Sequence, residues 1–192
     1  MPPKFKYTRE QIISVALYLL RKGGIVAVTA RAIGEELCSS PKVIFSLFED
    51  MGEVKYEMTA AAKALYKSYV EKGLEQDPPF KGVGMSYIKF AIEEPQLFRL
   101  LFMQENASVP RLDDVLLLIE NSYELILQSI ETSYGFTRET AEEIYRHLWI
   151  YSHGIATLIA TRVCYFSLEE ISRMLSEVFK GILIQYKSEG KT

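Results

Sequence analysis

The stretch ELCSSPKVIFSLFEDM, residues 36–51, decides how the rest of the chain is interpreted. Its polar residues 38–40 break a helical pattern, and Ser40 can cap a new helix. Pro41 suits the first position of that helix, because its missing N–H would have no intrahelical partner there. The apolar residues expected to anchor this short helix are Ile44, Phe45 and Phe48. A helix this short forms no core alone, so the flanking segments must supply its platform.

Helical periodicity continues on both sides of the stretch, whereas alternating strand patterns are nearly absent. A first helix opens at a capping box of Thr8 and Gln11 and is stopped at residues 23–24, which are both glycine. A second helix opens at Thr29, and a fourth covers residues 51–72. Three helices within about 50 residues, with a tight turn before the short third one, are typical of a helix-turn-helix.

In this layout the short third helix can enter a DNA major groove, about 12 Å wide, while the preceding helix lies over the phosphate backbone. Residues 1–56 hold eight Lys and Arg against six Asp and Glu, whereas residues 57–192 hold fourteen against nineteen. This mild asymmetry favours contact with an anion at the N-terminal end. The candidate DNA-contacting residues are Lys4, Lys6, Thr29, Arg31, Ser40, Pro41, Lys42, Val43, Phe45, Ser46 and Lys55.

The remainder of the chain adds five expected helices, near residues 80–93, 95–104, 112–133, 137–163 and 167–186. The segment QDPP, residues 76–79, is the clearest linker. We therefore expect an all-α fold of about nine helices. A helix-turn-helix domain is expected over residues 1–55 and a helical bundle over residues 56–192, joined by the helix at 51–72.

Residues 8–55 resemble the DNA-binding domain of the TetR family of transcriptional regulators. The residues that carry the resemblance, in matching order and spacing, are Thr8, Ile12, Ala16, Gly23, Thr29, Ile33, Ser40, Ile44, Phe45, Phe48 and Val54. Four positions depart from the family pattern. Gly34 replaces an Ala, Cys38 replaces the turn Gly, Leu47 replaces a His or Tyr that touches phosphate, and Met51 replaces a Lys. A left-handed backbone at Cys38 would therefore be strained.

The C-terminal part resembles TetR members more loosely, through residues 87–103 and through LWIYSHGIATLIA, residues 148–160. The resemblance implies a homodimer formed by the last two helices and a small-molecule pocket among the middle ones. The candidate ligand-binding residues are Phe90, Phe98, Phe102, Tyr123, Tyr145, Trp149 and His153. The candidate dimer-interface residues are Ile155, Ile159, Arg162, Ile171, Leu175, Val178 and Ile182. His153 either lines the pocket or is a buried imidazole with satisfied hydrogen bonds.

The sequence thus predicts a DNA-binding transcriptional regulator, a ligand-released repressor that binds a pseudo-palindromic operator as a homodimer. Its partners would be double-stranded DNA, a second copy of itself and a small-molecule effector of unknown identity. The alternative is an all-helical small-molecule-binding protein or enzyme without DNA binding. That alternative requires a catalytic constellation, and the sequence has neither a G-x-S-x-G elbow nor a dinucleotide-binding glycine loop.

Metal, cofactor and membrane sites are not expected. His147 and His153 are six residues apart and so point to different faces of a helix. Cys38 and Cys164 are too few for a disulfide framework and fit a reducing cytosol, and Cys38 is either a small turn residue or a redox-sensitive thiol. The opening MPPKFKY has no apolar signal-peptide core, and the longest apolar window is too short to span a membrane. We therefore expect a cytoplasmic protein without cofactor.

Overall fold

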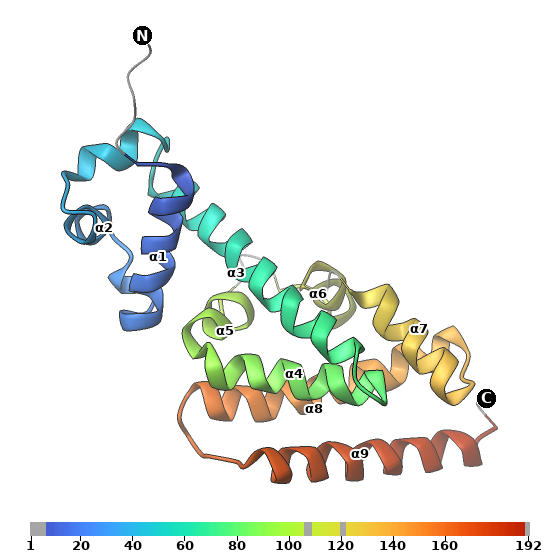
Figure 1. The fold of residues 1–192 in the computed structure, drawn as a ribbon. Helices are drawn as coiled ribbons and strands as arrows, with labels where there is room; N and C mark the ends of the chain where they lie inside the picture. The colour runs from blue at the N-terminus through green and yellow to red at the C-terminus, as the bar shows by residue number, and fades with distance from the viewer. Residues whose placement is uncertain (1–6, 106–108, 120–121, 191–192) are drawn as a thin grey trace. The chain divides into compact units, whose positions relative to one another are not determined.

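The computed structural model describes residues 7–105, 109–119 and 122–190, and all regular structure within them is helical (Figure 1). The α-helices are α1 (Arg9–Gly23), α2 (Ala30–Glu36), α3 (Met51–Leu74), α4 (Pro79–Glu93), α5 (Pro95–Phe102), α6 (Leu112–Ile119), α7 (Tyr123–Tyr134), α8 (Arg138–Ala160) and α9 (Leu168–Ser188). Two 3₁₀ helices, η1 (Ile25–Ala27) and η2 (Pro41–Ser46), complete the set. The expected all-α fold is confirmed.

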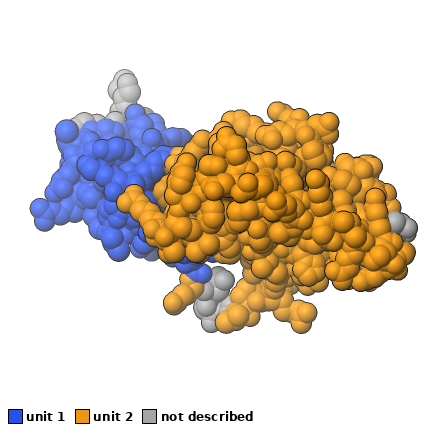
Figure 2. Space-filling view, turned by 90° about the horizontal axis from the view of Figure 1, so that it is seen from below, with its two compact units in different colours: residues 1–64, 96–104 blue, residues 65–95, 105–192 orange. Residues whose placement is uncertain are grey.

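The chain divides into two compact units, which Figure 2 colours differently. Unit 1 contains residues 1–64 and 96–104, and unit 2 contains residues 65–95 and 105–192. The division falls within α3 and at the start of α5, rather than at residue 55, where the sequence places the domain boundary. The helix α3 therefore belongs to both units, and nearly all of α5 belongs with the N-terminal helices.

Unit 1 is built on α1, which packs against η1 and α2. The capping box of Thr8 and Gln11 opens α1, and the Thr29 side chain caps α2. Spacings of three and four residues bring the apolar side chains onto common faces. The side chains buried in this core include Ile12, Ala16, Leu20, Ile33, Ile44, Val54 and Met58.

Three expected helices differ in the structure. The short third helix is a 3₁₀ helix with i→i+3 hydrogen bonds, such as Val43 N–H to the Ser40 carbonyl at 3.1 Å. The expected helix at 112–133 is two helices, α6 and α7, and the backbone of Ser122 before α7 lies outside the helical region. The expected helix at 137–163 ends at Ala160, because Arg162 adopts a left-handed φ of 59°.

Unit 2 is centred on α4, which packs against α7, α8 and α9. The two glycines Gly73 and Gly82 bring the end of α3 against α4, since a Cβ on Gly82 would lie 2.1 Å from the Gly73 carbonyl oxygen. Phe90, Ile144 and Ile155 are among the buried apolar side chains of this unit. None of the described helices has the length and apolar composition that a membrane span requires.

Candidate functional site

The turn between α2 and η2 is closed by two backbone hydrogen bonds. The Ser39 N–H donates to the Gly34 carbonyl at 2.8 Å, and the Cys38 N–H donates to the Glu35 carbonyl at 3.0 Å. This is the pattern of a Schellman C-cap, which places a left-handed residue just after the helix. Cys38 occupies that position with φ 48°, where the absence of a Cβ would favour glycine. The strain expected at Cys38 from the sequence is therefore located at this turn.

The helix η2 has a buried side and an exposed side. The Ser40 hydroxyl accepts from the Lys42 N–H at 3.3 Å, and Pro41 occupies the first helical position. Ile44 is 0% exposed and Phe48 is 3% exposed, so both anchor the helix as expected. Phe45 was expected to serve as a third anchor, and this expectation is wrong: its side chain is 50% exposed. Phe45 therefore belongs to the outward surface.

The other candidate DNA-contacting residues lie around this outward surface. Pro41, Lys42, Ser46 and Lys55 are exposed, and Val43 is half-buried. Thr29 is exposed and its hydroxyl accepts from the Ala32 N–H at 3.1 Å at the start of α2. Arg31 donates from Nε to the Glu35 carboxylate at 2.8 Å. Lys4 and Lys6 lie outside the described residues.

Sequence reasoning missed an arginine that fixes the loop after η2. The Arg9 guanidinium donates to the carboxylates of Glu53 and Glu57 and to the carbonyl oxygen of Leu47. It also lies over the Phe48 ring, 4.1 Å from the ring centroid. These hydrogen bonds raise the pKa of Arg9 and lower the pKa of Glu53. The spacing of Glu53 and Glu57 by four residues on one helix face is the signal that could have revealed the pair.

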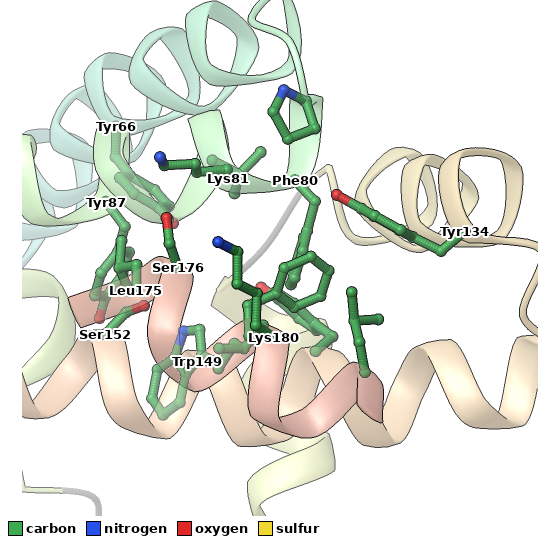
Figure 3. A pocket seen from close by; sticks show the side chains of 17 residues that line it. Tyr66, Phe80, Lys81, Tyr87, Tyr134, Trp149, Ser152, Leu175, Ser176 and Lys180 are labelled. Atoms are coloured by element: carbon green, nitrogen blue, oxygen red, sulfur yellow. The ribbon is translucent and has the colours of Figure 1, made fainter. Parts of the chain in front are cut away.

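Unit 2 contains a cavity of about 290 Å³, at the lower end of the size range of small-molecule sites (Figure 3). Side chains from α3, α4, α7, α8 and α9 line it, together with Pro78. Its apolar and aromatic walls include Phe80, Val83, Tyr87, Tyr145, Leu148, Trp149, Leu175 and Phe179. The remaining side chains of the lining that carry a polar group are Tyr66, Lys81, Tyr134, Ser152, Ser176 and Lys180. The arrangement suits an apolar molecule with a small polar group.

Aromatic contacts hold one end of the cavity. The Phe80 ring lies 5.5 Å from the Phe179 ring and 6.4 Å from the Tyr145 ring, centroid to centroid. Tyr134 meets Phe179 edge-on at 5.0 Å. Such edge-to-face pairs stabilise one arrangement of the rings. Burial raises the pKa of Tyr134, with a further contribution from Asp77, so its hydroxyl stays protonated at neutral pH.

His153 does not line the cavity but contacts two residues that do, Trp149 and Tyr87. Its ring stacks on Trp149 with centroids 4.8 Å apart, and its Nδ1 lies 2.9 Å from the Tyr87 hydroxyl. Burial lowers the pKa of His153. With Nδ1 unprotonated, the Tyr87 hydroxyl donates to it. Of the two alternatives left open by the sequence, the structure places His153 as a partly buried imidazole with a hydrogen-bond partner.

The structure places the candidate ligand-binding residues in three environments. Tyr145 and Trp149 line the cavity. Tyr123 packs against Tyr145 with centroids 5.6 Å apart, and Phe90 is fully buried against Tyr66, so neither is part of the wall. Phe98 and Phe102 belong to unit 1, where their rings lie 5.0 Å apart. The wall residues that the sequence did not indicate include Phe80, Lys81, Phe179 and Lys180.

The candidate dimer residues lie on or next to α8 and α9, which pack against each other. Those buried within a single copy are Ile155, Ile171 and Leu175. Those accessible to a partner are Ile159, Arg162, Val178 and Ile182. The same two helices also expose apolar side chains, namely Ile150, Leu158, Leu168 and Ile184. Among the described residues, no cluster of His, Cys, Asp and Glu side chains could hold a metal ion.

Comparison with known proteins gives a family and a fold. Residues 80–179, more than half of the chain, match the family model described as tetracyclin repressor-like, C-terminal domain. A TetR variant from Acinetobacter baumannii AYE, solved in complex with minocycline, is 13% identical with a TM-score of 0.58, over 97% of this chain and 99% of that chain. A proposed transcription regulator from Streptomyces coelicor is 19% identical with a TM-score of 0.47, over 94% of this chain and 96% of that chain. Comparison with curated proteins gives no match.

Proposed function

Because the chain belongs to the TetR family of transcriptional regulators, we propose that it acts as a DNA-binding, ligand-released repressor and functions as a homodimer. The family consists of regulators and not of enzymes. The observation that carries the DNA-binding proposal is the two-sided helix η2. Its apolar anchors are buried, while Pro41, Lys42 and Ser46 face outward from a tight turn.

The outward surface of unit 1 offers groups suited to both bases and phosphates. Phe45 and Ser46 can meet base edges in the major groove, where apolar contact with a thymine methyl and hydroxyl hydrogen bonds are both available. Lys42 and Lys55 form none of the ion pairs found among the described residues, so their ammonium groups remain available to phosphate. The exposed Thr29 and Arg31 at the start of α2 are the proposed backbone contacts there.

The homodimer proposal rests on α8 and α9. The accessible candidates Ile159, Val178 and Ile182, with the exposed Leu158 and Ile184, supply apolar area that a second copy would bury. A twofold dimer would present two η2 helices about 34 Å apart, one turn of DNA, and would read a pseudo-palindrome. Analytical ultracentrifugation should show a dimer, and Leu158→Arg together with Ile184→Arg should shift it to monomer.

The effector proposal rests on the cavity in unit 2. The helix α3 carries Lys55 at one end and Tyr66, which lines the cavity, further along. A ligand that favours one position of α3 would thereby change the affinity for DNA. The ligand must bind the DNA-free form more tightly, with a coupling free energy of about 1–3 kcal/mol.

The experiment that tests DNA binding is selection from random duplexes, followed by gel-shift titration at several salt concentrations. Lys55→Ala should weaken binding to all sequences evenly and reduce the salt slope by about one. Lys42→Ala should weaken binding and, if Lys42 touches a base, also relax the preference at that position. Lys72→Ala, an exposed lysine at the other end of α3, is the matched control and should change neither. Absence of any sequence-selective binding would favour the alternative of a small-molecule binder without DNA binding.

A further inference from the structure

We propose that the cavity of unit 2 binds an aromatic or otherwise apolar ligand that carries one carboxylate, held by Lys81 and Lys180. The inference deepens the proposed function, because it rests on the cavity being the effector site. It assigns the chemical class of the effector from the charges and shape of the lining.

The lining of the cavity has a one-sided charge. It includes Lys81 and Lys180 but neither Asp nor Glu. Neither lysine takes part in an ion pair among the residues that the structure describes. Lys89, also on α4, differs in this respect, since its ammonium lies 3.7 Å from the Glu93 carboxylate. The cavity is therefore lined by two lysines whose ammonium groups contact no carboxylate of the described residues.

Two acidic residues lie near the lysines along the chain, Asp77 before Lys81 and Glu177 before Lys180, and neither forms an ion pair with them in the described part of the chain. Asp77 lines an adjoining hollow that shares Pro78 and Lys81 with the cavity. In the part of the chain that the structure describes, Asp77 forms no ion pair with Lys81. Asp77 is exposed, so solvent weakens its effect on the two lysines, although its charge contributes to the raised pKa of Tyr134.

Both lysines belong to the lining of the same cavity. In the view of Figure 3, Lys81 from α4 and Lys180 from α9 appear on the same side of the cavity as Ser176. The Ser176 hydroxyl donates its hydrogen to the Ser172 carbonyl at 2.8 Å, so it is not a free donor for a ligand. Lys81 is half-buried and Lys180 is exposed, which places this cationic region towards solvent. A carboxylate there can accept from both lysines and remain partly hydrated.

The rest of the cavity lining requires an apolar body in the ligand. Phe80, Val83, Tyr87 and Leu175 are all buried, and they leave few polar atoms for a hydrated group. A volume of about 290 Å³ at the low end of ligand sites suits a molecule of one or two rings. The two lysines would also repel an organic cation of the same shape, which provides discrimination by charge.

The test uses matched pairs of ligands that differ only in charge. Trp149 is the single tryptophan of the chain and lines the cavity, so its fluorescence reports binding there directly. Phenylpropanoate and phenylpropanamide are titrated by fluorescence, and naphthylacetate and naphthylacetamide by calorimetry. Each carboxylate should bind about tenfold more tightly than its amide, because its two hydrogen bonds are charge-assisted. The difference should shrink as salt is raised.

Variants of the lysines separate this assignment from a general effect of charge. The double variant Lys81→Gln/Lys180→Gln should bind each carboxylate and its amide equally, whereas Lys187→Gln, an exposed lysine near the end of α9, should keep the preference. Circular dichroism melting of each variant verifies that the fold is retained. Amides that bind as tightly as carboxylates, or the absence of binding by all four compounds, would overturn the assignment. Failure of the same preparation to bind DNA would instead contradict the proposed function and leave the charge preference standing.

Discussion

The candidate site of unit 1 is an exposed surface, whereas the candidate site of unit 2 is a cavity. In unit 1 the candidate surface faces outward and comes mainly from one short stretch, residues 40–46, supported by α2 and the start of α3. In unit 2 the candidate site faces inward and is assembled from five helices between Tyr66 and Leu183. The comparison shows that an exposed surface can be encoded locally, whereas a cavity depends on how distant helices pack. Each prediction below tests one side of this difference.

The largest expected effect separates the buried and exposed sides of η2. Ile44→Ala should lower the free energy of unfolding of unit 1 by about 2–4 kcal/mol, because it leaves a cavity at a fully buried position. Phe45→Ala, at the adjacent exposed position, should change this free energy by no more than about 0.5 kcal/mol while weakening DNA binding. Urea denaturation followed by circular dichroism, together with gel shifts, measures both quantities.

Comparing the two variants distinguishes an anchoring role of Phe45 from an exposed one. Equal destabilisation by the two variants would mean that Phe45 anchors the helix after all, and unit 1 would not have an outward reading surface of the proposed composition. Unchanged DNA affinity in Phe45→Ala would limit the base contacts to the polar residues around it.

The second prediction contrasts the two units by pH. Burial lowers the pKa of His153 from 6.5. The unfolded chain therefore binds more protons than the folded chain between the lowered pKa and 6.5. The free energy of unfolding of unit 2 should fall as pH drops through this interval. The slope contributed by one histidine is at most about 1.4 kcal/mol per pH unit. The pKa of Glu53 in unit 1 is lowered from 4.5 chiefly by its hydrogen bond with Arg9. The stability that this carboxylate contributes is present above pH 4.5 and is lost in more acidic solution.

Two variants that cannot titrate isolate these contributions. His153→Gln can still accept a hydrogen bond from the Tyr87 hydroxyl, and it should flatten the melting temperature between pH 7 and pH 5. Glu53→Gln should leave that interval unchanged and affect only the more acidic range. An identical pH profile for wild type and His153→Gln would show that another group in unit 2 controls the interval.

The sequence identified the features of both units that are local. The caps at Thr8, Thr29 and Ser40 and the start of the last helix at residue 167 are confirmed, because each depends on residues within one turn. The helix type of η2 was not predictable, since six residues with apolar spacings of one and three fit either an α or a 3₁₀ turn. Phe45 was predicted both as an anchor and as a DNA-contacting residue, because hydrophobicity alone does not distinguish a buried side chain from an exposed one.

The cavity was predicted only in part. Tyr145 and Trp149 were among the candidates, but aromatic residues at helical spacing mark a packed core as readily as a cavity wall, as Phe90 and Phe98 show. Lys81 and Lys180 lie almost a hundred residues apart in the sequence and line one cavity only through the packing of α4 and α9. A single sequence has no signal for such a pair, since each lysine alone is typical of a solvated helix face.

The smallest expected effect concerns the ends of two helices, one in each unit. Cys38 after α2 has φ 48°, and Arg162 after α8 has φ 59°. In both places the next N–H reaches back to the helix, from Ser39 to Gly34 and from Val163 to Leu158. Both are therefore Schellman caps in which a side chain occupies the glycine position. Cys38→Gly should raise the free energy of unfolding by about 0.5–1 kcal/mol, since relief of left-handed strain exceeds the added flexibility of the unfolded chain.

Arg162→Gly should stabilise unit 2 by a similar amount, because its backbone is held in the same conformation. Cys38→Ala is the matched control, since it removes the thiol but keeps the Cβ and should give no gain. If Cys38→Ala stabilises the protein as much as Cys38→Gly does, the thiol rather than the backbone is the unfavourable element at this turn. Stabilisation by both glycine variants, measured by urea denaturation, would show that the two units share the same local strain although their sites face in opposite directions.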